Sequence, residues 1–102
     1  MDTITYNAIN NAVTTVPGVK SLANYESQDI WDLETKDIAK AVEIVSSGSI
    51  HRVKVHVILM NGFNIRDVVN EVQIRVKYEL EKLKQFTMSY SVDVVVDDLQ
   101  MI

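Results

Sequence analysis

The sequence predicts an α+β domain in which two helices cover one face of a small three- to four-stranded sheet, in the order α-(β)-β-β-α-β. Three observations lead to this prediction. Residues 50–60 alternate apolar and polar side chains, residues 65–85 repeat apolar side chains at helical spacing, and a second alternating stretch, 88–97, follows. The 102 residues are enough for a single domain, 1–102, and too few for two.

The first segment, residues 3–15, is predicted to be a helix with Thr3 as a candidate N-cap. Its small or apolar side chains recur at helical spacing: Thr5, Ala8, Ile9, Ala12, Val13 and Val16. Pro17-Gly18 ends the helix, because proline cannot continue it and glycine accepts the turn. A short strand is then indicated over 19–25, followed by a mixed, polar connection, 26–40, whose path the sequence does not define.

Residues 41–45 and 50–60 are predicted to form a hairpin joined by a short loop that contains Gly48. In its second strand the valines at 53, 55 and 57 alternate with Arg52, Lys54 and His56. One face of this strand is therefore expected to belong to the core, and the other to be largely polar.

After Asn61-Gly62 the spacing becomes helical, and one apolar stripe runs along the segment: Ile65, Val68, Val69, Val72, Val76, Leu80 and Leu83. Asn64 is expected to cap this helix. In the last strand the valines at 92, 94 and 96 alternate with Ser91, Asp93 and Val95. Because this strand follows a long helix, it is a candidate for parallel pairing in the sheet.

Composition excludes several kinds of site. The chain has no cysteine, so neither a disulfide framework nor a thiolate zinc site is possible. A net charge of −4 gives no general attraction to nucleic acid or anionic lipid. The first residues lack a signal-peptide pattern, and the nearly apolar run 53–60 is too short to cross a bilayer. We therefore expect a cytoplasmic chain without direct membrane insertion, which reaches a membrane only through a partner.

Four segments carry a resemblance to a known family. They are the helix end Val16-Pro17-Gly18-Val19, the strand and turn 53–65, the helix core 69–77 and the closing strand 91–96. In this order they resemble the alkaline shock protein family of Gram-positive and related bacteria. Two positions depart from its pattern: Phe63 stands where a small aliphatic residue is usual, and Lys84-Gln85-Phe86-Thr87 replaces a turn that normally contains glycine.

The resemblance implies a small cytoplasmic protein linked to cell-envelope stress. Some family members self-associate, and some are held near the membrane by a membrane-anchored partner of the same family. The resemblance implies no enzymatic activity, cofactor or catalytic residue. We therefore expect the chain not to be an enzyme and to hold no cofactor or metal.

The residues themselves offer few candidates for chemistry. His51 and His56 are five apart in a predicted strand, so they are expected on opposite faces and cannot share a metal ion. Asp93 and Asp97 are four apart, a separation of about 13 Å along a strand, which is too far for one cation. No Ser/His/Asp triad or phosphate-binding loop is recognisable.

The candidate interaction surface consists of Arg52, Lys54, His56, Trp31, Asp93 and Val95. The simpler interpretation of its basic strand, with the neighbouring Glu43, is a solvated sheet face. Trp31 in the irregular connection is most simply a plug at the edge of the core, and alternatively an interface anchor. Gln73 interrupts a strongly periodic helix, where it lies on the flank or hydrogen-bonds an adjacent backbone group.

We therefore expect a non-catalytic interaction or scaffold protein linked to cell-envelope stress. It would self-associate or dock to a membrane-anchored protein by strand addition at a sheet edge, with the strand 52–60 and the last strand as the favoured surfaces. One alternative is a nucleic-acid-binding accessory domain that uses Arg52 and Lys54, although the sheet aromatics and G-x-x-G clamp of small RNA-binding domains are missing. The other is an accessory subunit of an enzyme, which would show neither activity nor assembly alone.

Overall fold

The computed structural model describes residues 2–48 and 50–101. Its elements follow one another as α1 (Thr3–Thr14), β1 (Val19–Ala23), η1 (Ile30–Asp32), β2 (Glu34–Thr35), η2 (Ile38–Lys40), β3 (Val42–Ser47), β4 (Ile50–Met60), α2 (Ile65–Leu83) and β5 (Tyr90–Gln100). The predicted order is confirmed, and the sheet has five strands. The additional strand is β2, a two-residue segment inside the connection that the sequence left undefined.

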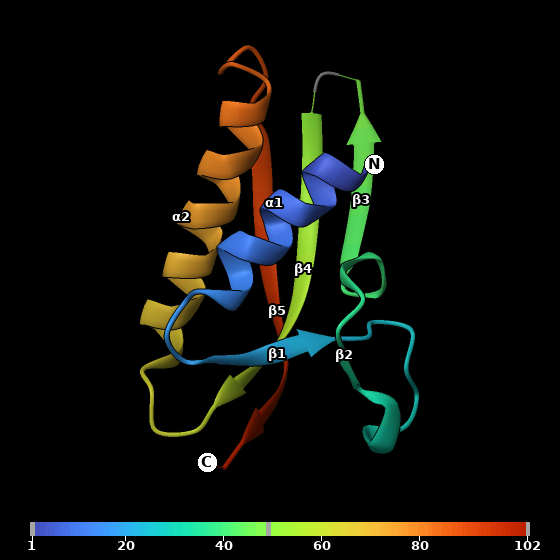
Figure 1. Ribbon diagram of the computed structural model, residues 1–102, viewed down its shortest axis with the longest axis vertical. Coiled ribbons are helices and arrows are strands. Elements are labelled where there is room, and N and C mark those ends of the chain that lie inside the picture. The colour runs from blue at the N-terminus through green and yellow to red at the C-terminus, as the bar shows by residue number, and fades with distance from the viewer. Residues whose placement is uncertain (1, 49, 102) are drawn as a thin grey trace.

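Strand β4 is the centre of the sheet. On one side β5 runs parallel to it along almost its whole length, from the pair His51–Tyr90 to the pair Met60–Gln100. On the other side β3 pairs antiparallel with the first half of β4, and β1 with the second half. The expected parallel pairing of the last strand is thus confirmed, and β3 and β5 form the two long edges of the sheet (Figure 1).

Both helices pack on the same face of the sheet, as predicted; in Figure 1 α1 crosses in front of β4 and β5, and α2 runs lengthwise beside β5. The core between them is aliphatic and fully buried at its centre, with the largest contributions from Ile9, Val13, Val53, Val55, Val57, Leu59, Val72, Val76 and Leu80. Each such side chain stabilises the fold by about 1.5–3 kcal/mol relative to exposure. No helix of the described residues covers the opposite face of the sheet.

Capping side chains fix where the helices begin. Asp2, and not Thr3, is the N-cap of α1, because its Oδ1 accepts the Thr5 N–H at 2.8 Å. Hydrogen bonds from the Thr5 hydroxyl and from this N–H hold the pKa of Asp2 below its usual value. Asn64 caps α2 as predicted, with Oδ1 accepting the Asp67 N–H at 3.1 Å.

The turn after α1 brings the two helices into contact. Gly18 has a φ of +98°, and a Cβ there would lie 2.7 Å from Cγ2 of Val68 and 3.1 Å from the ring of Phe63. Only glycine fits this turn without displacing the start of α2. The aromatic ring at 63, a departure from the family pattern, therefore packs directly on the glycine of the turn.

Candidate functional site

The uncovered face of the sheet carries five of the six residues predicted to form an interaction surface. Arg52, Lys54 and His56 lie on β4, and Asp93 and Val95 lie beside them on β5, where Lys54 pairs with Asp93 and His56 with Val95. This juxtaposition follows from the parallel β4–β5 register. The sixth residue, Trp31, lies elsewhere.

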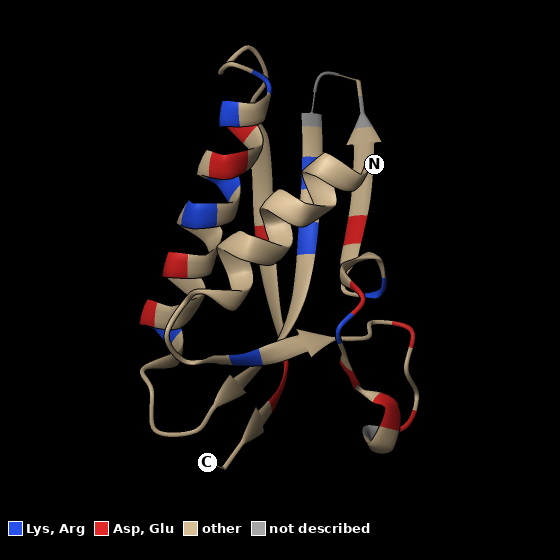
Figure 2. Ribbon diagram, in the orientation of Figure 1, with Lys and Arg blue, Asp and Glu red and all other residues tan. Residues whose placement is uncertain are grey.

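Charges of both signs alternate across this face. Arg52 and Lys54 line a shallow hollow of about 240 Å³ together with Glu43, Val45 and Asp93. Lys54 has Glu43 as its ladder partner on β3 and Asp93 as its partner on β5. Figure 2 shows the two basic bands on β4 with acidic bands on the neighbouring strands. Each phosphate contact from this basic pair would therefore be opposed by a nearby carboxylate.

The sequence suggested that His56 is part of an exposed polar strip. In the structure it belongs instead to a buried side-chain cluster. The residue is 8% exposed. Its Nδ1 lies 2.8 Å from Oδ2 of Asp97 on β5, and its Nε2 lies 2.5 Å from Oε2 of Glu43 on β3. Both ring nitrogens donate to these carboxylates when the imidazole is protonated. His56 therefore ties three strands together and has no ring nitrogen left for a partner.

The ring of Tyr25 covers the same cluster, with its centroid 5.3 Å from that of His56. Burial, with further contributions from Glu26 and Glu43, raises the pKa of Tyr25 above its usual value. The sequence signal for this cluster was weak, because Glu43, His56 and Asp97 come from three strands whose register depends on the whole fold.

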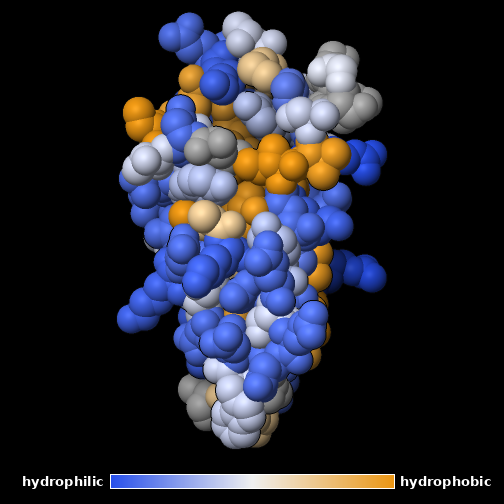
Figure 3. All heavy atoms as spheres, turned by 90° about the vertical axis from the view of Figure 1, so that its right-hand side faces the viewer, coloured by the Kyte–Doolittle hydropathy of each residue, from blue (hydrophilic) through white to orange (hydrophobic). Residues whose placement is uncertain are grey.

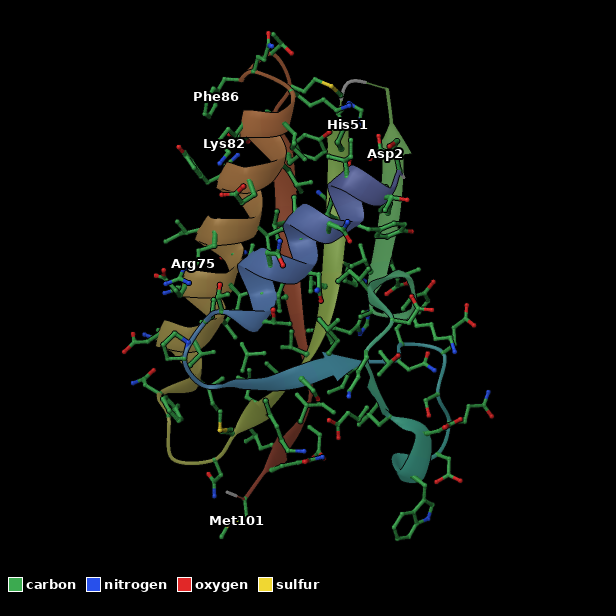
Figure 4. The ribbon with its side chains drawn as sticks, in the orientation of Figure 1. Asp2, His51, Arg75, Lys82, Phe86 and Met101 are labelled. Atoms are coloured by element: carbon green, nitrogen blue, oxygen red, sulfur yellow. The ribbon has the colours of Figure 1, made fainter. Side chains whose placement is uncertain are left out.

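His51 lies on the other face of the sheet, as its odd separation from His56 predicted. It lines a small hollow with Asp2 at the start of α1, and Figure 4 places these two labelled residues close to one another near the upper end of the sheet. Its ring packs on Tyr90 with centroids 5.5 Å apart. Within residues 2–48 and 50–101 no group of three or more histidine, aspartate or glutamate side chains is arranged to hold a metal ion.

Trp31 is 90% exposed, so the interpretation of this residue as a core plug is wrong. It sits on η1, where Oδ1 of Asp29 accepts its backbone N–H at 3.0 Å. The connection that carries it runs beyond β1 and β2 at the lower right of Figure 1. Trp31 is thus separate from the residues on the sheet face.

Strand β4 is not an edge, which corrects the expectation that 52–60 can accept an added strand. It pairs with β5 on one side and with β3 and β1 on the other. Its backbone groups are therefore used inside the sheet. A partner strand can reach only β3 or β5 among the long strands of the described chain.

The edge formed by β5 is occupied at its beginning by side chains of α2. Gln73 Nε2 donates to the Val92 carbonyl oxygen at 2.7 Å, and Lys77 Nζ donates to the Tyr90 carbonyl oxygen at 2.9 Å. The Tyr90 N–H donates to Oε2 of Glu81 at 3.1 Å. Hydrogen bonds from the Lys77 ammonium and from this N–H hold the pKa of Glu81 below its usual value.

The end of β5 is interrupted as well. The ladder to β4 contains a bulge at Asp97, because Val57 pairs with Val96 and the next residue of β4 pairs with Asp98. The Asp98 carboxylate accepts the Leu99 N–H at 2.9 Å. Bulges and inward-turned charges are the devices by which proteins protect an edge strand. Of the described residues with outward backbone groups, only Val94 and Val96 lie between the two protected ends.

The edge formed by β3 lacks such protection. His56 N–H donates to the Ala41 carbonyl oxygen at 2.8 Å, so Ala41, Glu43 and Val45 direct their backbone groups toward β4. The alternate residues, Val42, Ile44 and Ser46, direct theirs outward, and within the described chain these outward N–H and carbonyl groups have no hydrogen-bond partner.

Exposed apolar side chains accompany this open edge. Ile44 is 39% exposed, Val45 is 60% exposed, and Ile4 in the first turn of α1 is 68% exposed. Figure 3, which faces the β3 side of the molecule, shows apolar atoms across the upper half of this surface. The sequence held one signal that sequence reasoning missed: Val42–Ser47 contains neither the lysine nor the proline with which edge strands are usually protected.

Comparison with known proteins gives one match. Residues 2–101 match the model of the alkaline shock protein family, which is described as having a cell envelope-related function. The comparisons with curated proteins and with solved structures give no match. None of the helices in the described residues is both long and apolar enough to span a bilayer.

Proposed function

The chain belongs to the alkaline shock protein family, whose function is related to the cell envelope, and from this premise we propose that it is a cytoplasmic, non-catalytic interaction protein. It binds a protein partner, either a second copy of itself or a membrane-anchored protein, through a sheet edge. It thereby serves as a scaffold in an envelope-related process.

The open edge of β3 is the observation that carries this proposal. Three residues of β3 have outward backbone groups, and the side chains of Ile44 and Val45 on the same strand are exposed. A strand added here gains backbone hydrogen bonds worth about 0.5–1.5 kcal/mol each and buries apolar surface at about 25 cal/mol per Å². These gains must exceed the loss of rotational and translational freedom. We therefore expect a reversible interaction whose extent depends on protein concentration.

The nucleic-acid alternative has less support. Arg52 and Lys54 are the cations on the open sheet face of β4, and carboxylates stand beside Lys54 on both neighbouring strands. A phosphate backbone following this face would meet Glu43 and Asp93 as well. The accessory-subunit alternative shares the surface proposed above and differs in its partner.

Size-exclusion chromatography with light scattering tests the proposal, with concentration and salt varied and absorbance read at 260 and 280 nm. A mass that rises with concentration, without nucleic-acid absorbance, supports self-association. A second arm follows the tagged chain in fractionated cells, because docking to a membrane-anchored partner would bring it into the membrane fraction. A strict monomer found wholly in the supernatant contradicts the proposal, and co-eluting nucleic acid supports the alternative.

A further inference from the structure

We propose that the occupant of the β3 edge is a second copy of this chain, paired antiparallel about Ile44 so that two five-stranded sheets become one continuous sheet. This inference rests on the interaction function proposed above and specifies the surface, the partner and the register. It also predicts that assembly stops at two chains.

Backbone geometry restricts the register. In an antiparallel pair, residues with outward backbone groups must face one another, so Val42, Ile44 and Ser46 can pair only among themselves. Centring the two-fold axis on Ile44 pairs Val42 with Ser46 of the second copy, and Ile44 with its own equivalent. All three outward residues of each chain are then used. Centring on Val45 leaves Val42 opposite the Gly48 loop, with fewer hydrogen bonds.

Charge selects the same register. A pairing centred on Glu43 would place the two Glu43 carboxylates directly opposite each other, and like charges at that spacing are destabilising. With the axis at Ile44, each Glu43 instead faces Val45 of the second copy. Arg52 is the ladder partner of Val45, so it lies two strands, about 10 Å, from the second copy's Glu43 on the same sheet face. The register thus separates the two Glu43 carboxylates and places no like charges directly opposite each other.

Side chains on the two faces fit this arrangement. On the helix-covered face the half-exposed Ile44 meets its equivalent in the second copy. On the open face Val45, which is 60% exposed, packs against the aliphatic part of the opposing Glu43. β-Branched residues directly opposite one another are favourable cross-strand pairs.

The difference between the β3 and β5 edges explains why assembly stops at two chains. The β5 edge is blocked at its start by Gln73, Lys77 and Glu81 and is interrupted by a bulge near its end. A fibre would require β3 of one copy to pair with β5 of the next, as in a heterologous contact. Among the long strands of the described residues, β3 alone has an edge that is open along its length, so the contact joins identical surfaces, which is the geometry of a closed dimer.

Disulfide trapping tests the register, because the chain has no cysteine of its own. At a two-fold axis on Ile44 the two Cα atoms are about 5.5 Å apart, as in a hydrogen-bonded antiparallel pair. This separation lies within the range of about 4.4–6.8 Å that a disulfide spans. We expect Ile44→Cys to form a covalent dimer under mild oxidation at least about tenfold faster than either control, because pairing raises the local thiol concentration.

Each of the two controls introduces a single cysteine on another surface of the chain. Ile74→Cys places the thiol on α2, where Ile74 is 63% exposed, and Leu99→Cys places it on β5, where Leu99 is 43% exposed. Far-ultraviolet circular dichroism confirms that each variant is folded. Equal crosslinking of all three variants overturns the inference.

Light scattering of the unmodified chain distinguishes a failure of the β3 pairing from a failure of self-association itself. If the chain assembles and Ile44→Cys does not crosslink, the β3 pairing is wrong, while the proposed interaction function stands. If the chain does not assemble and Ile44→Cys does not crosslink, self-association itself is contradicted. Masses that climb beyond two chains overturn the closed dimer.

Discussion

The side-chain amide of Gln73 donates a hydrogen bond of 2.7 Å to the carbonyl oxygen of Val92, and so joins α2 to the free edge of β5. The polar residue inside the apolar repeat of α2 is thereby explained, as one of the two interpretations of the sequence had proposed. Lys77 and Glu81 follow Gln73 on the same side of α2 and form hydrogen bonds with the backbone carbonyl oxygen and N–H of Tyr90. The helix thus covers the core and also protects one sheet edge.

Replacing Gln73 with leucine is expected to lower the free energy of unfolding by about 1 kcal/mol, because the Val92 carbonyl loses its donor. The variant should also assemble beyond two chains, since more of the β5 edge becomes available. Urea denaturation measures the first effect and light scattering the second. Asn70→Leu, at an exposed position one turn earlier in α2, is the control and should change neither.

Replacing His56 with phenylalanine is expected to destabilise the fold by about 1–2 kcal/mol, since the ring that joins Glu43 to Asp97 by hydrogen bonds at the centre of the sheet is lost. Urea denaturation of His56→Phe beside His51→Phe checks this. His51 has one weak contact of this kind, 3.4 Å to Ser46, so the second variant should lose much less stability. Equal losses would show that the cluster does not stabilise the sheet.

The end of α2 contains strain that glycine would relieve. Gln85 follows the C-cap Lys84 and has a φ of 54°, the left-handed conformation that glycine normally adopts at this position. Gln85→Gly is therefore expected to raise the free energy of unfolding by about 0.5–1 kcal/mol. Lys84→Gly, at a φ of −96°, should lower it. A Gln85→Gly variant less stable than the wild type would contradict this interpretation of the turn.

Glu81 makes stability depend on pH in the acid range. Its pKa in the folded chain lies below the ordinary 4.5, because Lys77 and the Tyr90 N–H donate to its carboxylate. The unfolded chain therefore takes up this proton at higher pH than the folded chain. The contribution of Glu81 is fully present above about pH 4.5 and is lost as pH falls through the lowered value. Glu81→Gln should flatten the dependence of urea midpoints on pH in that window, and an unchanged slope would contradict the assignment.

The β3 register also predicts opposite responses to charge at one position. Val45 faces Glu43 of the second copy in the proposed dimer, so Val45→Glu places two carboxylates opposite each other and should weaken association. Val45→Lys removes the same apolar surface but places an ammonium there, and should associate more tightly than the glutamate variant. Sedimentation equilibrium at two salt concentrations measures the difference, which should shrink at high salt. Equal dissociation constants would contradict this register.

Local patterns were sufficient to predict most of the fold. The alternating side chains of β4 and the apolar stripe of α2 showed which face of each packs in the core between helices and sheet, although His56 and Ile58 on the opposite face of β4 are buried as well. The crossover from α2 predicted the parallel β5. The N-cap at Asn64 was likewise readable from its neighbours.

The errors concern long-range pairing. Three features depend on which strands become neighbours. They are the central place of β4, the enclosure of His56 by Glu43 and Asp97, and the unprotected edge of β3. In the connection 26–40, isolated backbone bonds hold the chain, such as Asn24 N–H to the Leu33 carbonyl oxygen. Such bonds leave no periodic signal, and the exposed position of Trp31 could not be inferred.

Light scattering of Ile44→Lys beside the wild type and Ile74→Lys tests the central claim most directly. Ile44→Lys would place two ammonium groups opposite each other on the dimer axis, whereas Ile74→Lys makes the same change on α2. At high concentration the wild type and Ile74→Lys should reach the mass of two chains, and Ile44→Lys should keep the 11.6 kDa of one. If a folded Ile44→Lys still pairs as the wild type does, the β3 edge is not the surface of assembly.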